Sequence, residues 1–227
     1  MPSSRTRVTA VIERLSAAGV VVDRSGQEHA LFPVAITPAE GRSLREWVVH
    51  ERATDSVEIG LGYAFATLHI VDGLLANAAG SSSVRHVAID PFQGSRFADL
   101  GHSHLAEAGV ADLVEVHQEE SQLLLPMMVV ERRSFDFAFV DGNHRFDRVF
   151  LDLVYLGRLL RPSAVVFVDD VQLRAIARSI EFLTSNRDWK VEELSGADPE
   201  HQWAVLRTPV ELDDRGYADF CDFAPLP

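Results

Sequence analysis

Residues 135–153 read FDFAFVDGNHRFDRVFLDL and predict a strand, a loop and a helix in succession. Phe135–Val140 is an almost uninterrupted apolar run of strand length, which is typical of a strand buried inside a sheet. From Phe146 to Leu160 the apolar residues are spaced by threes and fours, which is the pattern of one buried helix face. The polar segment Asp141–His144 therefore follows the end of a strand, where functional groups gather in such folds.

The same alternation of strands and helices runs through most of the chain. The predicted strands are Asp55–Ile59, Val84–Ile89, Leu113–Val116, Phe135–Val140, Ala164–Val168, Trp189–Leu194 and Trp203–Arg207. The predicted helices between them are Phe65–Ala79, Phe97–Ala108, Ser121–Val130, Phe146–Leu160 and Ile176–Leu183. This order predicts an α/β fold with a seven-stranded, mostly parallel sheet and helices on both faces. Because ligands of such sheets bind at the carboxyl ends of strands, we expect the function near Gly60, Asp90, Gln118, Asp141 and Asp169.

The first fifty residues follow a different pattern. We expect helices over Thr6–Ala18 and Pro38–His50, and a small hairpin within Gly19–Val34 that turns at Ser25-Gly26. We interpret residues 1–50 as an N-terminal helical extension or cap and residues 51–227 as the main domain. The sequence leaves open whether the extension covers the active-site side or a subunit interface.

The charge and cysteine content of the chain indicate which partners and which cellular location to expect. The chain has 227 residues and a formal net charge of −13, which argues against nucleic-acid and anionic-membrane partners. The single cysteine, Cys221, excludes an internal disulfide and fits a reducing cytoplasm. The first residues are too polar for a secretion signal, and no apolar run reaches the length of a membrane span. We therefore expect a cytoplasmic protein.

A glycine-rich loop follows the first predicted strand of the main domain. Residues 57–68 read VEIGLGYAFATL, so that Gly60 and Gly62 lie between a strand and a helix, where they allow a sharp turn and a close approach to a ligand. Phe65 is too bulky for a dinucleotide fingerprint, and no Gly-Lys-Ser/Thr follows, so this is not a phosphate-binding P-loop. The acidic Glu58 suits a cationic ligand. A tight connection with no ligand is the alternative.

This loop resembles the first motif of class I S-adenosylmethionine (SAM)-dependent methyltransferases, which runs acidic–x–Gly–x–Gly–x–Gly. Glu58, Gly60 and Gly62 match it, and Ala64 replaces the third glycine. The resemblance implies a Rossmann-like methyltransferase fold with SAM as cofactor. It also implies that the acidic residue at the end of the second strand, Asp90, accepts both ribose hydroxyls, since a carboxylate can take a diol in bidentate fashion. The alternative is a solvated carboxylate at a strand end.

Two further segments extend the resemblance. Ser121 and Gln122, with Pro126, look like the segment that contacts adenine in catechol-type O-methyltransferases; the alternative is a helix start whose acidic neighbours suit the helix dipole. Residues 141–153 resemble the DGxHxYxxVxxDL signature of a branch of small-molecule O-methyltransferases. The matching residues are Asp141, Gly142, His144, Val149, Asp152 and Leu153, with Phe146 in place of the tyrosine.

The resemblance also implies a metal site. In metal-dependent relatives a cation lies at the positions of Asp141, Asp169 and Asp170, and three carboxylates in one cleft are suited to Mg²⁺ or Mn²⁺. Alternatively, these aspartates face solvent or cap helices. From the resemblance we expect Asp141 to contact the cofactor, to bind the metal and to take part in catalysis. His144 is either the base that takes the acceptor proton or a residue without a chemical role.

The leading hypothesis is a metal-assisted O-methyltransferase whose partner is a small hydroxylated molecule. A metal-independent methyltransferase acting on oxygen or nitrogen is the second, and a non-catalytic SAM-binding or interaction module is the third. A dehydrogenase is disfavoured by Phe65. Relatives of this kind often form dimers, so a homodimer is also an expectation.

Overall fold

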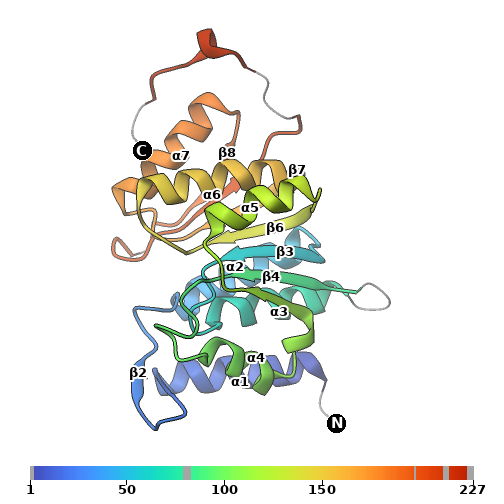
Figure 1. Ribbon diagram of the computed structural model, residues 1–227, viewed down its shortest axis with the longest axis vertical. Helices are drawn as coiled ribbons and strands as arrows, with labels where there is room; N and C mark the ends of the chain where they lie inside the picture. The colour runs from blue at the N-terminus through green and yellow to red at the C-terminus, as the bar shows by residue number, and fades with distance from the viewer. Residues whose placement is uncertain (1–2, 79–82, 197, 212–214, 224–227) are drawn as a thin grey trace. The chain divides into compact units, whose positions relative to one another are not determined.

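The computed structural model describes residues 3–78, 83–196, 198–211 and 215–223. The chain divides into two compact units, residues 1–120 and 121–227. Seven strands form one mostly parallel sheet flanked by helices, which confirms the predicted fold class (Figure 1). The predicted division of the chain at residue 50 stays a prediction.

Unit 1 contributes three parallel strands in the order β5-β4-β3. These are β3 (Asp55–Ile59), β4 (Arg85–Ile89) and β5 (Val114–His117), and the last residue of β4, Ile89, pairs with both Ile59 and His117. Every residue of β3 is buried, as expected for a parallel strand that is covered on both faces. The loops after β3 and β4 consequently begin at the same edge of the sheet.

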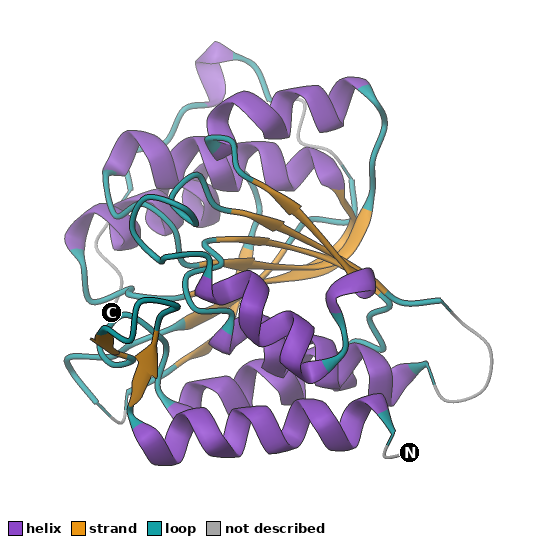
Figure 2. Cartoon of the chain, turned by 60° about the horizontal axis from the view of Figure 1, so that its bottom comes forward, coloured by secondary structure: helices purple, strands orange, loops and turns teal. Residues whose placement is uncertain are grey.

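The helices of unit 1 are α1 (Ser4–Ala18), α2 (Pro38–His50), α3 (Phe65–Asn77) and α4 (Leu100–Ala108), with a short 3₁₀ turn at Ala111–Leu113. Both α1 and α2 pack on α3. The α2–α3 contact is close because α3 carries Gly73, where a Cβ atom would lie 2.8 Å from a methyl carbon of Val48. A small hairpin, β1 (Val20–Val22) and β2 (Glu28–Ala30), appears in Figure 2 as two short arrows apart from the sheet.

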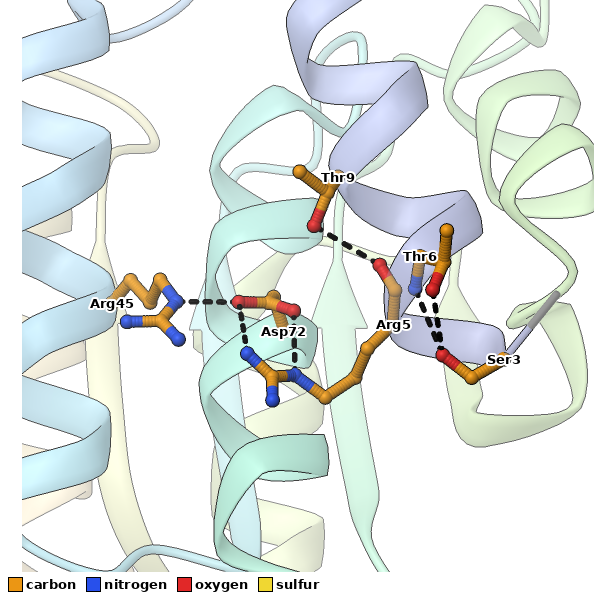
Figure 3. A network of polar contacts seen from close by, with 6 residues as sticks. All are labelled: Ser3, Arg5, Thr6, Thr9, Arg45 and Asp72. Atoms are coloured by element: carbon orange, nitrogen blue, oxygen red, sulfur yellow. Dashed lines mark hydrogen bonds and ion pairs between the residues drawn. The ribbon is translucent and has the colours of Figure 1, made fainter.

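An ion-pair network ties the N-terminal helices to α3. Asp72 of α3 is buried and accepts hydrogen bonds from Arg5 of α1, at 3.0 Å, and from Arg45 of α2 (Figure 3). One carboxylate thus joins three helices, which accounts for the packing of the N-terminal segment into unit 1.

Unit 2 contains the other strands in the order β6-β7-β9-β8. These strands are β6 (Phe135–Val140), β7 (Leu160–Val168), β8 (Lys190–Leu194) and β9 (Ala204–Arg207). The helices of unit 2 are α5 (Ser121–Val130), α6 (Phe146–Leu159) and α7 (Arg174–Asn186), and a 3₁₀ turn lies at Tyr217–Asp219. β6 and β7 are parallel, whereas β9 runs antiparallel to both β7 and β8. The loops after β6 and β7, which carry the aspartates, therefore lie at one edge.

Most element boundaries that differ from the predictions do so by one or two residues, but two elements begin three residues or more from the predicted start. The helix expected to begin at Phe97 begins at Leu100, because residues 92–99 form turns in which Ala98 and Asp99 adopt left-handed conformations. The strand expected to begin at Ala164 already begins at Leu160, directly after α6. Ala79, the expected end of the helix that begins at Phe65, lies outside the described residues. Among the described helices, none is long and apolar enough to cross a membrane.

Candidate active site

The glycine loop after β3 has the left-handed backbone conformations that a sharp turn requires. Gly60 has φ 100°, Gly62 φ 51° and Ala64 φ 62°, a region that only glycine occupies without strain. The amide of Gly60 donates a 2.9 Å hydrogen bond to the carbonyl of Ile89, which ties the loop to the end of β4. A Cβ atom at Gly62 would meet no heavy atom within 4 Å, so a ligand could approach the backbone there.

Asp90 lies directly beside this loop. Its side chain accepts 2.8 Å hydrogen bonds from the amides of Gly62 and Phe92, and a 2.9 Å hydrogen bond from the side-chain amide of Gln93. Asp90 is only 3% exposed. A carboxylate has about four acceptor positions, so three donors leave room for about one more. The remaining acceptor position is on Oδ1, which among the described residues accepts only from the amide of Phe92, so a ribose hydroxyl could bond there without displacing Gly62 or Gln93.

Glu58 belongs to a buried polar chain within unit 1. It has no accessible surface, accepts a 2.5 Å hydrogen bond from the hydroxyl of Thr67, and lies 3.2 Å from Nε2 of His86. The other ring nitrogen of His86 hydrogen-bonds to Ser56 at 2.8 Å. These contacts connect β3, β4 and α3. The predicted direct contact between Glu58 and a ligand has no support in this geometry.

The two predicted adenine contacts begin helix α5 in unit 2. Ser121 is buried and hydrogen-bonds to the side chain of Asp152 on α6, whereas Gln122 is half-buried. Burial raises the pKa of Asp152 to about 7, against the smaller opposing effect of the bond to Ser121. The assignment of Ser121 and Gln122 as adenine contacts stays a prediction.

A cluster of two carboxylates and one imidazole lies at the ends of β6 and β7. Ligand atoms of Asp141, His144 and Asp170 all lie within 4.8 Å of one another. Nε2 of His144 is 3.0 Å from Oδ2 of Asp170 and 3.8 Å from Oδ1 of Asp141. Gln172 donates a 2.7 Å hydrogen bond to the other oxygen of Asp170, which fixes that carboxylate. The three groups could hold a divalent cation.

Asp169, the third predicted ligand, is not part of this group. It is buried, and its Oδ1 accepts a 2.6 Å hydrogen bond from the backbone amide of Asp170. The backbone turns at this point, because Asp170 has φ 57°. His144 takes the place in the cluster that the sequence prediction gave to Asp169.

The cluster perturbs the titration of its members. Burial raises the pKa of Asp141, and the charges of Asp169 and Asp170 raise it further. The carboxylates of Asp141 and Asp170 raise the pKa of His144 to about 10. Burial opposes ionisation of Asp170, but the contact with His144 outweighs burial and lowers its pKa. Without a cation, the two carboxylates therefore favour the protonated form of His144, which has no free nitrogen to accept a proton.

Sequence reasoning missed one residue at these sites and considered a different role for another. Gln93 was not singled out, although it follows Asp90 by three residues, a spacing that lets a side chain fold back onto a strand end. His144 was predicted only as a base, because its distance from Asp170 depends on how two separate loops fold. The only sequence signal for a ligand role was its position three residues after Asp141.

Comparisons with known proteins agree with this architecture. The family model described as a methyltransferase domain matches residues 57–171, which is more than half of the chain. An O-methyltransferase of Bacillus cereus in complex with SAH (S-adenosylhomocysteine) is 20% identical, with a TM-score of 0.67 and 92% of each chain covered. The O-methyltransferase TomG of Streptomyces achromogenes, involved in tomaymycin synthesis and solved with SAM, is 21% identical, with a TM-score of 0.66, 92% of this chain covered and 91% of that one.

No curated protein matches the sequence significantly. At these identities the two solved structures show a shared fold, while the family model covers both the glycine loop and the aspartate segments after β6 and β7. The resemblance to class I methyltransferases is confirmed, and the chain belongs to the methyltransferase-domain family of enzymes.

Proposed function

We propose that this chain uses SAM to methylate an oxygen on a small hydroxylated molecule. The observation that carries the proposal is the contact between Asp90 and Gly62, which joins an acidic strand end to an open glycine loop. A carboxylate at the end of this strand suits the hydroxyl groups of a nucleoside sugar. The SAM and SAH bound in the two similar structures support the same cofactor here.

The proposed cofactor residues of unit 1 are Gly60, Gly62 and Asp90, with Glu58 acting indirectly. Glu58 bonds to Thr67 on the first turns of α3 and thereby holds the helix that follows the loop. Ser121, Gln122 and Asp141 of unit 2 are proposed as further cofactor contacts. SAM itself supplies an activated methyl group on a good leaving group, so the protein must mainly orient the acceptor and help to remove its proton.

We further propose that Asp141, His144 and Asp170 bind one divalent cation. The fit rests on the donor set, because two carboxylates would repel each other without a positive charge between them. In the absence of a cation that charge is the proton on His144, and a bound cation would replace it, since metal binding releases protons from its ligands. The cation would supply Lewis-acid activation of a hydroxyl group. A set that includes imidazole suits Mn²⁺ better than Mg²⁺, which prefers oxygen ligands.

The roles of the two remaining predicted groups follow from their contacts. As a ligand His144 would have Nε2 occupied, and as an imidazolium it has no free acceptor, so we propose a ligand in place of the predicted base. Asp169 would act indirectly, by fixing the backbone of Asp170. Asp141 would contribute to catalysis as a ligand.

A metal-independent methyltransferase is the second candidate. It is favoured by the 3.0 Å contact between His144 and Asp170, which can neutralise the cluster without any cation. In that case the two residues would hold the acceptor by hydrogen bonds and the reaction would be insensitive to chelators. The metal dependence of turnover distinguishes the two candidates.

The remaining proposals concern the context of the enzyme. We propose residues 1–50 as an extension of the main domain, because α1 and α2 precede β3 and pack on α3. A cytoplasmic location is proposed from the single free cysteine, and a homodimer from the resemblance. Sedimentation of the purified protein tests the dimer.

Binding calorimetry with SAM, SAH and NAD tests the cofactor. Micromolar or tighter binding of SAM and SAH, with none of NAD, is the expected result. Methyl transfer from labelled SAM to a panel of phenols, catechols and sugars then tests the acceptor class. Binding of NAD without either methionine nucleoside would contradict the proposal.

A further inference from the structure

The side chain of Gln93 lies beneath the glycine loop and contacts two of its functional groups at once. It is completely buried, and its Nε2 donates hydrogen bonds of 2.8 Å to the carbonyl of Gly62 and 2.9 Å to Oδ2 of Asp90. A carbonyl and a carboxylate are both acceptors, so only the amino end of the side-chain amide can face them. The orientation of Gln93 is therefore determined by its partners.

The carbonyl end of Gln93 faces helix α4. Its Oε1 is buried and accepts no hydrogen bond from the described residues. A Cβ atom at Gly101 of α4 would lie 2.5 Å from this oxygen and 2.9 Å from the carbonyl oxygen of Gly62. The absence of a side chain at Gly101 thus lets α4 press Gln93 against the loop.

Together these contacts fix both polar groups of the Gly62 backbone. The amide of Gly62 donates to Asp90, and its carbonyl accepts from Gln93, which also donates to Asp90. The three residues form a closed ring of hydrogen bonds. A residue at φ 51° whose amide and carbonyl are both held cannot rotate without breaking one of these bonds.

We propose that Gln93 is the positioning residue of the cofactor site, which holds Gly62 and Asp90 in the arrangement that binds the nucleoside part of SAM. This inference rests on the proposed function. Gln93 acts through its two partners and has no surface from which to touch the cofactor or the acceptor. Its loss should therefore weaken the binding of SAM and SAH, and should leave turnover at saturating SAM close to that of the unmodified enzyme.

The first test is the affinity for SAH of Gln93→Met and Gln93→Glu. Methionine has a similar length and no donor, and the dissociation constant should rise roughly tenfold or more because a buried carbonyl and a carboxylate lose their donor. The Gln93→Glu variant should bind SAH more weakly still, because the new carboxylate would face two hydrogen-bond acceptors, the carbonyl of Gly62 and the carboxylate of Asp90. The matched control is Gln27→Met, the same change at an exposed position of unit 1, which should bind SAH normally.

A second variant perturbs the ring without removing its donor. Gly101→Ala places a methyl group against Gln93 and Gly62, and it should also weaken SAH binding. Alanine favours helix more than glycine does, so a weakened helix α4 would not explain that loss. This variant decides the question if Gln93→Met proves too unstable to purify.

A double-mutant cycle separates positioning from a general effect on folding. If Gln93 acts through Asp90, then adding Gln93→Met to Asp90→Ala should cost less SAH affinity than Gln93→Met does alone. Losses that multiply independently would overturn the proposal. So would Gln93→Met and Gly101→Ala proteins that bind SAH within twofold of the unmodified chain. Failure of the unmodified chain to bind SAH would instead overturn the proposed function.

Discussion

Nε2 of His144 lies 3.0 Å from a carboxylate oxygen of Asp170, although the two residues come from the loops after different strands. Those strands, β6 and β7, are parallel neighbours, so their carboxyl ends meet. This contact places His144, and not Asp169, in the cluster with Asp141 and Asp170. The first prediction concerns that cluster.

Asp170→Asn should weaken the binding of Mn²⁺ roughly tenfold or more, since even indirect partners of metal ligands act on that scale. It should leave the affinity for SAH close to that of the unmodified chain, because Asp170 belongs to the proposed metal cluster and is not among the proposed cofactor contacts. Electron paramagnetic resonance measures free Mn²⁺ and gives the affinity. The matched control is Asp147→Asn, an exposed aspartate of unit 2 outside the cluster. Full turnover in excess chelator would contradict the metal assignment and favour the metal-independent candidate.

Asp90→Ala should weaken the binding of SAH by about 1.5–3 kcal/mol, the usual contribution of a hydrogen bond to a charged group. The variant also releases Gly62, so part of the loss would reflect a looser loop. Calorimetry gives the free energy, and Asp99→Ala, whose side chain lies outside the ring, is the control. An unchanged affinity would mean that Asp90 only completes the fold of its loop.

Gly60→Val should abolish SAH binding while the protein stays folded. Gly60 has φ 100°, which a β-branched residue does not adopt, so the loop must change its path. The control is Gly26→Val in the hairpin, where φ is 87° and a Cβ atom would meet nothing within 4 Å. Both variants introduce backbone strain, but only the first lies at the proposed site. Equal SAH binding by the two variants would reduce the glycine loop to a connector.

Asp72→Asn should lower the free energy of unfolding by about 1–3 kcal/mol at neutral pH, because a buried carboxylate with two arginine partners loses its charge. Burial alone would raise the pKa of Asp72, but the hydrogen bonds from Arg5 and Arg45 outweigh it and lower the pKa. The stabilisation is thus complete above the unfolded pKa of about 3.9 and is lost as the pH falls below it. Urea unfolding at several pH values should show the difference between variant and wild type shrinking in acid.

His69 should make unfolding sensitive to a different pH range. Burial lowers the pKa of His69 to about 4, with a smaller opposing effect from Asp72. The unfolded chain takes up a proton below its ordinary value of about 6.5, so stability should fall as the pH drops from about 6.5 towards 4. In His69→Gln this loss should disappear, whereas the acid effect of Asp72 should remain. A variant with the same pH profile as the wild type would show that His69 does not titrate in this range.

The secondary structure could be predicted from the sequence because its signals are local. The bounds of α2, β3, α5 and β6 agree with the predictions to the residue, since each begins or ends at a sharp change in apolar periodicity. The start of α4 could not be predicted, because the turns at residues 92–99 include Gln93, whose side chain bonds to the distant Gly62, and Phe92, whose amide bonds to the side chain of Asp90.

The sequence by itself determined the order of strands and helices, the glycine loop and the family, because these depend on residue type and spacing along the chain. Only the tertiary structure decided which polar groups meet. In the folded chain the side chain of Asp169 accepts a hydrogen bond from the backbone of Asp170, and His144 lies beside the carboxylate of Asp170. Gln93 donates a hydrogen bond to the carbonyl of Gly62. Contacts of this kind depend on the path of each loop and on the register of neighbouring strands. A single sequence does not encode that information in any local pattern.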